Sequence, residues 1–448
     1  MRISGTSRCL AVLVAAALSV GGSVLTASPA VAAPWTGDFY LPPDPLPDAA
    51  PGDILRSEPI QLPLSLPIGG VVTPARAQRI MYRSNDTHGN PVAVTGTYFE
   101  PSAPWTGPGD RPVVAVAPGT QGQGDQCAPS KTFAELIHYT FPLDLWVNYE
   151  VLTAYTLLAR GMSVVVTDYY GLGTPAMHDW INRRSQAHAV LDAARAAKKL
   201  PGTSLTAGSP VALAGYSQGG SGAAAAAELQ PTYAPELEVR GSVIGAPPAD
   251  LLATVHSATI EGGPLGNAAP SGAALGLFGY IANGIAADYP EAVPEIDRIV
   301  NADGKRMMAE VATTCVAEMG LRYMYRGSAM FTTSGRTLVE DILASPTLLA
   351  ILDEQRIGRL TPGAPVLISS STGDDVIPYA QVRQLAADWC GSGATVQLSK
   401  VDWLPPLLPS TNLGHDLGML PYLVESAGWL GDRFAGVPAA SNCARLPD

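Results

Sequence analysis

Short apolar runs alternate with amphipathic stretches along most of the chain. Runs of this length, bounded by glycine, proline or polar residues, predict strands that are buried on both faces. Such runs lie at 111–118, 161–168, 210–215, 238–248, 364–371 and 394–400. Helical spacing of apolar residues occurs between them, at 144–160, 187–200, 220–230, 379–390 and from about 416. Buried strands that alternate with helices predict an α/β fold, with a mostly parallel central sheet and helices on both faces.

The chain upstream of this alternation has a different pattern. A Pro-rich segment at 39–60 predicts an irregular arm that wraps the core. Residues 77–101 predict two antiparallel strands around a turn at 86–90.

The first 33 residues have the features of a secretory signal peptide. Arg2 and Arg8 precede an apolar run at 9–20, and Ala30-Val31-Ala32 offers an A-x-A cleavage site. The apolar run is short and rich in small residues, which argues against a membrane anchor. We therefore expect a secreted protein that begins near residue 33 or 34 and has no transmembrane segment.

The strand–helix alternation stops at about residue 250. The block 250–345 is mostly helical, and we expect it to be a cap inserted over the carboxyl edge of the sheet, between core segments 34–249 and 346–448. Within it, 268–287 contains twenty residues without a charge. We interpret this stretch as a buried or cap helix interrupted by Pro270. A lid face that touches lipid is the alternative, and a membrane span conflicts with secretion.

Composition excludes several classes of partner. Charged residues make up 15% of the chain, and the formal net charge is −12, or −14 once Arg2 and Arg8 leave with the signal peptide. An acidic protein is a poor ligand for nucleic acids and for anionic membranes. We expect a monomer whose partner is a small-molecule or lipid substrate.

The cysteines predict disulfides. Cys9 leaves with the signal peptide, and an even number remains in a secreted chain: Cys127, Cys315, Cys390 and Cys443. Two disulfides are expected, with three possible connectivities. Neither C-x-x-C nor H-E-x-x-H spacing occurs, so we expect neither a metal site nor a cofactor.

The hexapeptide GYSQGG at 215–220 carries the pattern G-x-S-x-G. A strand precedes it and a helix follows it, which is the context of a nucleophile elbow. The glycines allow the sharp turn, and the helix N-terminus points its dipole toward Ser217 and toward an oxyanion formed there. We predict that Ser217 is a nucleophile rather than a serine of an ordinary Gly-rich turn.

A serine hydroxyl needs a general base, and in this architecture the base comes last along the chain. Of six histidines, only His415 follows the final pair of predicted strands, in what we expect to be a loop before the last helix. A carboxylate at the end of strand 364–371 should orient it, and Asp374 and Asp375 are adjacent candidates. We favour Asp374, because it keeps the spacing D-x-x-[VI]-P with Ile377 and Pro378.

A tetrahedral intermediate also needs N–H donors. One is expected from the backbone of Gln218, the residue after the serine, and the other from the loop after strand 111–118. We predict the backbone N–H of Thr120 or Gln121. A phosphate-binding role for this Gly-rich loop is disfavoured, because neither G-K-[ST] nor G-x-G-x-x-G follows.

An ordered set of motifs resembles the motifs of a known family over nearly all of the mature chain. The marks are FYLPP (39–43), PGDILRSEPI (51–60), CAPS (127–130), VVVTDYYGLG (164–173), GYSQGG, GDDVIPYAQ (373–381) and the late histidine. Together they resemble the secretory lipase family of fungi and actinobacteria, typified by a yeast lipase A. The resemblance implies an α/β-hydrolase core with a helical cap, and a triad carried here by Ser217, Asp374 and His415.

The resemblance adds two details. It implies the pairs Cys127–Cys315 and Cys390–Cys443. The yeast member uses an aspartate side chain near its oxyanion hole, where this chain has Gln121. That departure puts a side-chain role in doubt but leaves the backbone donor, and the nearby Asp125 is out of register.

We therefore expect a secreted lipase that cleaves acylglycerol esters through an acyl-enzyme, without a cofactor. An esterase for short soluble esters and an acyltransferase or aminopeptidase would share the triad. A binding protein with an inactive triad is the alternative from a different class. Acyl length and the natural substrate depend on the cap.

Overall fold

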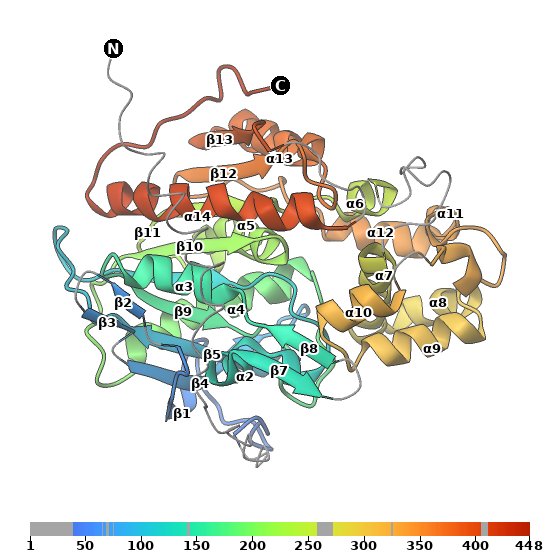
Figure 1. The fold of residues 1–448 in the computed structure, drawn as a ribbon, viewed down its shortest axis with the longest axis horizontal. Coiled ribbons are helices and arrows are strands. Elements are labelled where there is room, and N and C mark those ends of the chain that lie inside the picture. Colours follow the sequence, from blue (N-terminus) through green and yellow to red (C-terminus); the bar gives the residue numbers. More distant parts are fainter. Residues whose placement is uncertain are drawn as a thin grey trace, which may run out of the picture. The chain divides into compact units, whose positions relative to one another are not determined.

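A computed structural model describes residues 39–64, 66–68, 71–74, 76–140, 144–257, 272–323, 326–404 and 411–448 (Figure 1). The predicted signal peptide and the start of the uncharged stretch, 268–271, lie outside the described residues. The strands are β1 (Ile54–Ile60), β2 (Leu66–Ile68), β3 (Val71–Thr73), β4 (Arg76–Asn85), β5 (Pro91–Glu100), β6 (Val113–Ala117), β7 (Ile137–Thr140), β8 (Asp144–Val147), β9 (Ser163–Thr167), β10 (Val211–Tyr216), β11 (Val239–Gly245), β12 (Val366–Ser371) and β13 (Val396–Val401).

The helices occupy the segments between these strands and the block before β12. They are α2 (Pro129–Glu135), α3 (Glu150–Leu158), α4 (Arg183–Lys199), α5 (Gln218–Tyr233), α6 (Leu251–Ser257), α7 (Gly272–Asp288), α8 (Val293–Ile299), α9 (Ala302–Val311), α10 (Val316–Tyr323), α11 (Leu338–Leu343), α12 (Pro346–Glu354), α13 (Tyr379–Gly391) and α14 (Leu413–Phe434). Short 3-10 helices are η1 (Asp125–Cys127), η2 (Pro290–Ala292) and η3 (Ser328–Phe331).

The predicted buried strands form the centre of a nine-stranded sheet with the order β1-β4-β5-β9-β6-β10-β11-β12-β13. All neighbouring pairs from β9 to β13 are parallel. The pairs β1–β4, β4–β5 and β5–β9 are antiparallel, so the predicted hairpin around residues 86–90 is confirmed. A mostly parallel sheet is the result, as the alternation of strands and helices predicts.

The apolar runs are continuous because both faces of the sheet are covered. Successive side chains of a strand point to opposite faces. In β6, Val113 and Ala115 pack in the layer that contains α4, α5 and α13, whereas Val114 and Val116 pack in the layer with α3 and α14. Figure 1 labels these helices around the sheet. The parallel strands therefore carry all their carboxyl ends to one edge, where β6, β10 and β12 deliver the loops of the site.

The predictions for two segments are wrong in part. The Pro-rich arm is not wholly irregular, because residues 54–60 form β1 at the edge of the sheet, where Pro59 can sit without a ladder hydrogen bond. The helix expected at 144–160 is shorter, because 144–147 pair with β7 as a hairpin and α3 begins only at Glu150. An apolar run cannot reveal that a strand partner lies a few residues upstream.

The helical block after residue 250 supplies most of an apolar cluster that also includes Trp180 and Ile181. Side chains from α7, α8, α9, α10, α11 and α12 meet there, and the cluster continues beyond residue 345 to Leu348, Ile351 and Leu352. Within the described ranges, no helix combines the length and the hydropathy that a membrane span needs.

Candidate active site

Ser217 stands at the junction of β10 and α5. Its backbone is strained, with φ 60° and ψ −124°, a combination that L-residues rarely adopt. The N–H of Ser217 donates to the Gly245 carbonyl at 3.0 Å, which ties the turn to the neighbouring strand β11. Ser217 is half-buried, whereas Tyr216 and Gln218 on either side are buried.

Two glycines make this turn sterically possible. A Cβ on Gly215 would lie 2.1 Å from the Gly219 carbonyl oxygen. A Cβ on Gly219 would lie 2.0 Å from the Ala117 carbonyl oxygen at the end of β6. Because backbone atoms cannot move aside as a flexible side chain can, only glycine fits at both positions, as expected of a nucleophile elbow.

Three side chains predicted from the sequence lie in one hydrogen-bonded chain. His415 Nε2 is 2.8 Å from Ser217 Oγ, and His415 Nδ1 is 2.8 Å from Asp374 Oδ2. An ionised carboxylate can only accept, so Nδ1 carries the proton and Nε2 is left to accept from the serine hydroxyl. This arrangement can remove the hydroxyl proton when Ser217 attacks an acyl carbon.

The two adjacent aspartates have different partners. Asp374 is fully buried, and its second oxygen, Oδ1, accepts from the N–H groups of Val376 and Ile377. Asp375 points the other way and accepts from the N–H groups of Thr411, Asn412 and His415. Asp374 therefore contacts the imidazole, and Asp375 holds the backbone of the segment that carries it.

His415 does not lie in a loop, as expected from the sequence, but in the first turn of α14. The helix begins at Leu413 after Asn412, whose φ of 65° places it in the left-handed region. The Asp375 carboxylate accepts N–H groups at this helix start, which favours a helix boundary earlier than apolar spacing indicates.

The electrostatics around His415 favour its charged form. Burial of the imidazole lowers its pKa, but the charge and hydrogen bond of Asp374, together with Asp416 and Asp375, more than offset burial, so the pKa lies above its usual value. The neighbouring carboxylates would therefore stabilise an imidazolium at this position. Tyr216 donates its hydroxyl from β10 to the backbone carbonyl oxygen of His415 at 2.7 Å, which holds the backbone of this residue.

The predicted oxyanion residues approach the serine from two elements. Gln218 is the first residue of α5, so its backbone N–H has no partner within the helix. Thr120 and Gln121 follow β6 in the loop beside the elbow, and among the described residues no group accepts from their backbone N–H. The Gln121 side chain is occupied, since Nε2 donates to the Gly119 carbonyl and Oε1 accepts from Trp146.

A buried histidine that the sequence reading passed over holds the Gln218 side chain. His178 Nδ1 is 2.8 Å from the Tyr170 carbonyl oxygen and therefore carries the proton, so Nε2 accepts from Gln218 Nε2 at 3.2 Å. Burial lowers the pKa of His178 to about 4, which keeps the ring neutral and suited to this role. The carbonyl of His178 in turn accepts from Gln123.

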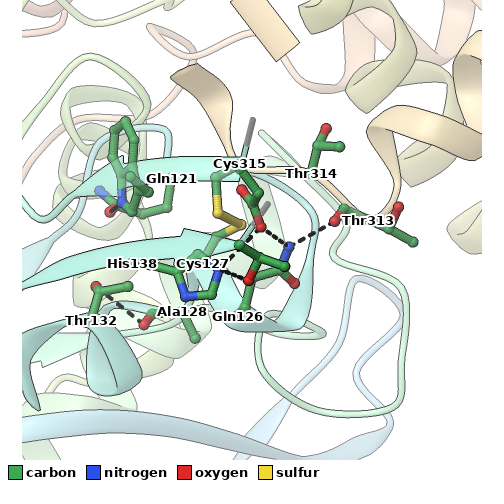
Figure 2. Close-up of a disulfide and its surroundings, with 12 residues drawn as sticks. Gln121, Gln126, Cys127, Ala128, Thr132, His138, Thr313, Thr314 and Cys315 are labelled. Atoms are coloured by element: carbon green, nitrogen blue, oxygen red, sulfur yellow. Dashed lines mark hydrogen bonds and ion pairs between the residues drawn. A yellow bond between two sulfur atoms is a disulfide. The ribbon is translucent and has the colours of Figure 1, made fainter. Parts of the chain in front are cut away.

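Both disulfides implied by the family resemblance are confirmed, Cys127–Cys315 and Cys390–Cys443. Figure 2 shows the first of them beside Gln121, Gln126 and Thr313. Its two cysteines are completely buried, and they join the loop after β6 to the start of α10. Backbone hydrogen bonds from Val316 to Gln121 and from Gln123 to Thr314 continue the same junction. The cap helices are thus bonded directly to the predicted oxyanion loop.

Removing the Cys127–Cys315 bridge is expected to be the more destabilising of the two disulfide losses. Chain-entropy arguments assign a disulfide about 2–5 kcal/mol, and more for a longer loop. The bridge spans 188 residues of sequence against 53 for Cys390–Cys443, which adds about 1 kcal/mol. Urea unfolding of Cys127→Ala/Cys315→Ala and Cys390→Ala/Cys443→Ala measures the difference, and a smaller loss in the first pair contradicts the expectation.

In the part of the chain that the structure covers, no three His, Cys, Asp or Glu side chains gather closely enough to hold a metal ion. Asp125, out of register in the sequence, begins η1, and burial raises its pKa.

Comparison with known proteins identifies a family and several relatives. A family model described as secretory lipase matches residues 141–442. A protein of Mycobacterium tuberculosis named a probable inactive lipase is 27% identical over 413 residues, which cover 92% of this chain and 85% of that protein. A secreted triacylglycerol lipase of Malassezia furfur is 26% identical over 412 residues, 90% of this chain and 77% of that protein.

Solved structures share the fold. Candida antarctica lipase A matches with a TM-score of 0.69 at 21% identity, covering 92% of this chain and 88% of that chain. The rice cell wall degrading esterase LipA from Xanthomonas oryzae matches with a TM-score of 0.65 at 18% identity, covering 86% of this chain and 100% of that chain. The predicted α/β-hydrolase fold is thereby confirmed.

Proposed function

The chain belongs to the secretory lipase family and is a carboxylic ester hydrolase, and we propose that it is a secreted acylglycerol lipase that works through an acyl-enzyme on Ser217. The observation that carries the proposal is the hydrogen-bonded chain Ser217–His415–Asp374 at the carboxyl edge of the sheet. Residues 1–33 would be removed as a signal peptide, in keeping with a family of secretory enzymes and relatives named as secreted.

In the first half-reaction, Ser217 Oγ attacks the acyl carbon and His415 Nε2 takes the hydroxyl proton. The resulting imidazolium is held by Asp374, and it then returns the proton to the oxygen of the leaving alcohol. The Ser217–acyl ester that remains is cleaved by water in the same way, with His415 again as the base. Both steps need only groups of this chain and water.

Negative charge develops on the carbonyl oxygen in each step. The backbone N–H of Gln218 and that of Thr120 or Gln121 are the donors that we propose for it. Support comes from the absence of any described acceptor for the two loop N–H groups, and from the position of Gln218 at the N-terminus of α5. Fixed donors stabilise this charge more than water does, because they do not reorganise.

We propose the helical block 250–345 as the cap that binds the acyl chain. An apolar pocket, open at one side, lies between α7, α8, α9 and α11 of this block and the helix that follows it, α12. Its wall on α7 includes Phe278, Ile281 and Ile285, and Asn283 of the same helix donates to Gln123 beside the predicted oxyanion loop. A lining without polar side chains suits a hydrocarbon chain.

Filling this pocket is expected to shorten the preferred acyl chain. Ala282 lines it, and Ala282→Phe should lower kcat/KM for a sixteen-carbon p-nitrophenyl ester by about tenfold while a four-carbon ester changes by less than about twofold. Leu321→Phe, on the exposed side of α10, is the matched control. If Ala282→Phe affects both esters equally, the pocket does not bind the acyl chain. If the wild type prefers the four-carbon ester, the enzyme is an esterase rather than a lipase.

A further inference from the structure

The loop after β6 is fixed by an unusually complete set of hydrogen bonds. All four carbonyl groups from Pro118 to Gln121 accept from buried or half-buried donors. The donors are the Tyr169 hydroxyl to Pro118, the Gln121 side-chain amide to Gly119, the Tyr149 hydroxyl to Thr120 and the Val316 N–H to Gln121. With its carbonyls bound, the loop cannot turn a peptide without breaking a bond, so the direction of its N–H groups is determined by these partners.

One N–H of the loop is held by a carboxyl group. Glu150, the first residue of α3, accepts from the Gly119 N–H at 2.7 Å. It is 1% exposed, and within the described part of the chain no Lys, Arg or His forms an ion pair with it. Burial raises the pKa of Glu150 to about 7, although the Gly119 N–H opposes that rise. Burying a carboxyl group without a cationic partner costs stability, so its presence beside this loop calls for an explanation.

Gly119 lies where a small displacement of the loop reaches the nucleophile. A Cβ built on Gly119 would be 2.2 Å from the Tyr149 hydroxyl and 3.1 Å from the carbonyl oxygen of Tyr216, which precedes Ser217. The loop therefore touches the elbow on one side and the start of α3 on the other. Thr120 and Gln121, the proposed donors to the oxyanion, follow Gly119 directly.

We propose that Glu150, with Tyr149 beside it, is the positioning residue of the oxyanion hole, acting by holding Gly119 so that the next two backbone N–H groups point at the substrate oxygen. The proposal rests on the proposed function of Ser217 and of this loop. It assigns Glu150 no contact with the substrate and no proton transfer. Either protonation state of Glu150 can accept from Gly119, so what matters is the acceptor oxygen and not the charge.

Two variants separate the acceptor from the charge. Glu150→Gln keeps an oxygen that can accept from Gly119 and should keep kcat within about threefold of wild type. Glu150→Leu removes the acceptor and leaves the Gly119 N–H unpaired. Because displacement of catalytic donors by about 1 Å costs about 10- to 100-fold, kcat for p-nitrophenyl butyrate should fall by that factor while KM changes by less than about twofold.

Comparing a thionoester with the matching oxoester shows whether the loss of kcat in Glu150→Leu comes from weaker stabilisation of the oxyanion. Sulfur accepts hydrogen bonds weakly, so a thionoester gains less than an oxoester from well-placed N–H donors. The ratio of oxoester to thionoester kcat should therefore fall at least fivefold or so in Glu150→Leu and stay at the wild-type value in Glu150→Gln. General damage to the fold lowers both rates together and leaves the ratio unchanged.

Glu228 provides the matched control. It is also a buried glutamate, and it accepts from Gly358, Leu360, Trp389 and Arg183 away from the loop. Glu228→Gln should lower the thermal midpoint without changing the oxoester to thionoester ratio. If Glu150→Leu does not fold, Tyr149→Phe makes the test, with a smaller fall in the same ratio expected.

The outcomes separate the two proposals. If wild type lacks hydrolysis that depends on Ser217, the proposed function fails. If wild type is active but neither Glu150→Leu nor Tyr149→Phe lowers the ratio, the positioning role of Glu150 is overturned. If Glu150→Gln loses as much as Glu150→Leu, the acceptor argument is wrong.

Discussion

Replacement of Ser217 by alanine is expected to lower kcat for p-nitrophenyl butyrate by about four to six orders of magnitude. The change removes the hydroxyl that lies within hydrogen-bonding distance of His415 Nε2, at 2.8 Å, and with it the covalent route. A small residual rate should remain, because the oxyanion donors and the binding site are intact. KM should change little, since the serine hydroxyl contributes to bond making and little to binding.

Covalent labelling makes this test independent of the choice of ester. An alkyl fluorophosphonate should modify wild type at Ser217 and leave Ser217→Ala unmodified. Ser392→Ala, which alters a serine at the end of α13, is the control and should label and hydrolyse as wild type does. One relative is named a probable inactive lipase, so a wild type that neither labels nor hydrolyses would make this chain a binding protein with an unreactive serine.

Replacement of each of the two adjacent aspartates by asparagine is expected to lower kcat to different extents. Asp374→Asn should lower kcat by about 10³- to 10⁴-fold, because an amide cannot stabilise the imidazolium and can impose the wrong tautomer on His415. Asp375→Asn should lower the thermal midpoint and reduce kcat by no more than about tenfold, because Asp375 binds backbone N–H groups of the His415 segment and not the ring. A larger kcat loss in Asp375→Asn would reverse the assignment.

The pH profile of Asp374→Asn carries a second expectation. His415 must be neutral to take the serine proton, so kcat/KM falls as pH drops through the pKa of His415. In wild type the neighbouring carboxylates raise this pKa above its usual value, so the acidic limb lies above pH 6.5. Removing the charge of Asp374 lowers the pKa, and the acidic limb should move to lower pH in the residual activity. If the acidic limb does not move, the result contradicts a direct contact between Asp374 and His415 in solution.

The order of the strands and of the candidate site residues along the chain could be predicted, because it follows from local sequence rules. Apolar runs predict β6, β9, β10, β11, β12 and β13, and the edge at which parallel strands end places Ser217, Asp374 and His415 together before any distance is known. Local rules do not separate Asp374 from Asp375. Adjacent side chains at a strand end diverge, and only the position of the imidazole tells which one meets it.

Other parts of the site had no local signal. Tyr216, His178 and Glu150 act through partners that are 199, 40 and 31 residues away in the chain. No motif or spacing in the sequence marks these positions, so local patterns could not select them. The hairpin of β7 and β8 was missed for a similar reason, because the apolar run 144–147 fits a helix until its partner strand is known.

The sequence by itself determined the parallel sheet, the glycine-flanked turn at Ser217, and the order of the proposed nucleophile, acid and base, because these follow from periodicity and from steric limits that only glycine meets. Tertiary structure decided which carboxylate orients His415, how the cap is bonded through Cys127–Cys315 to the loop after β6, and which side chains aim that loop. Those features depend on contacts between residues far apart in sequence, and such contacts form only when the layers pack together.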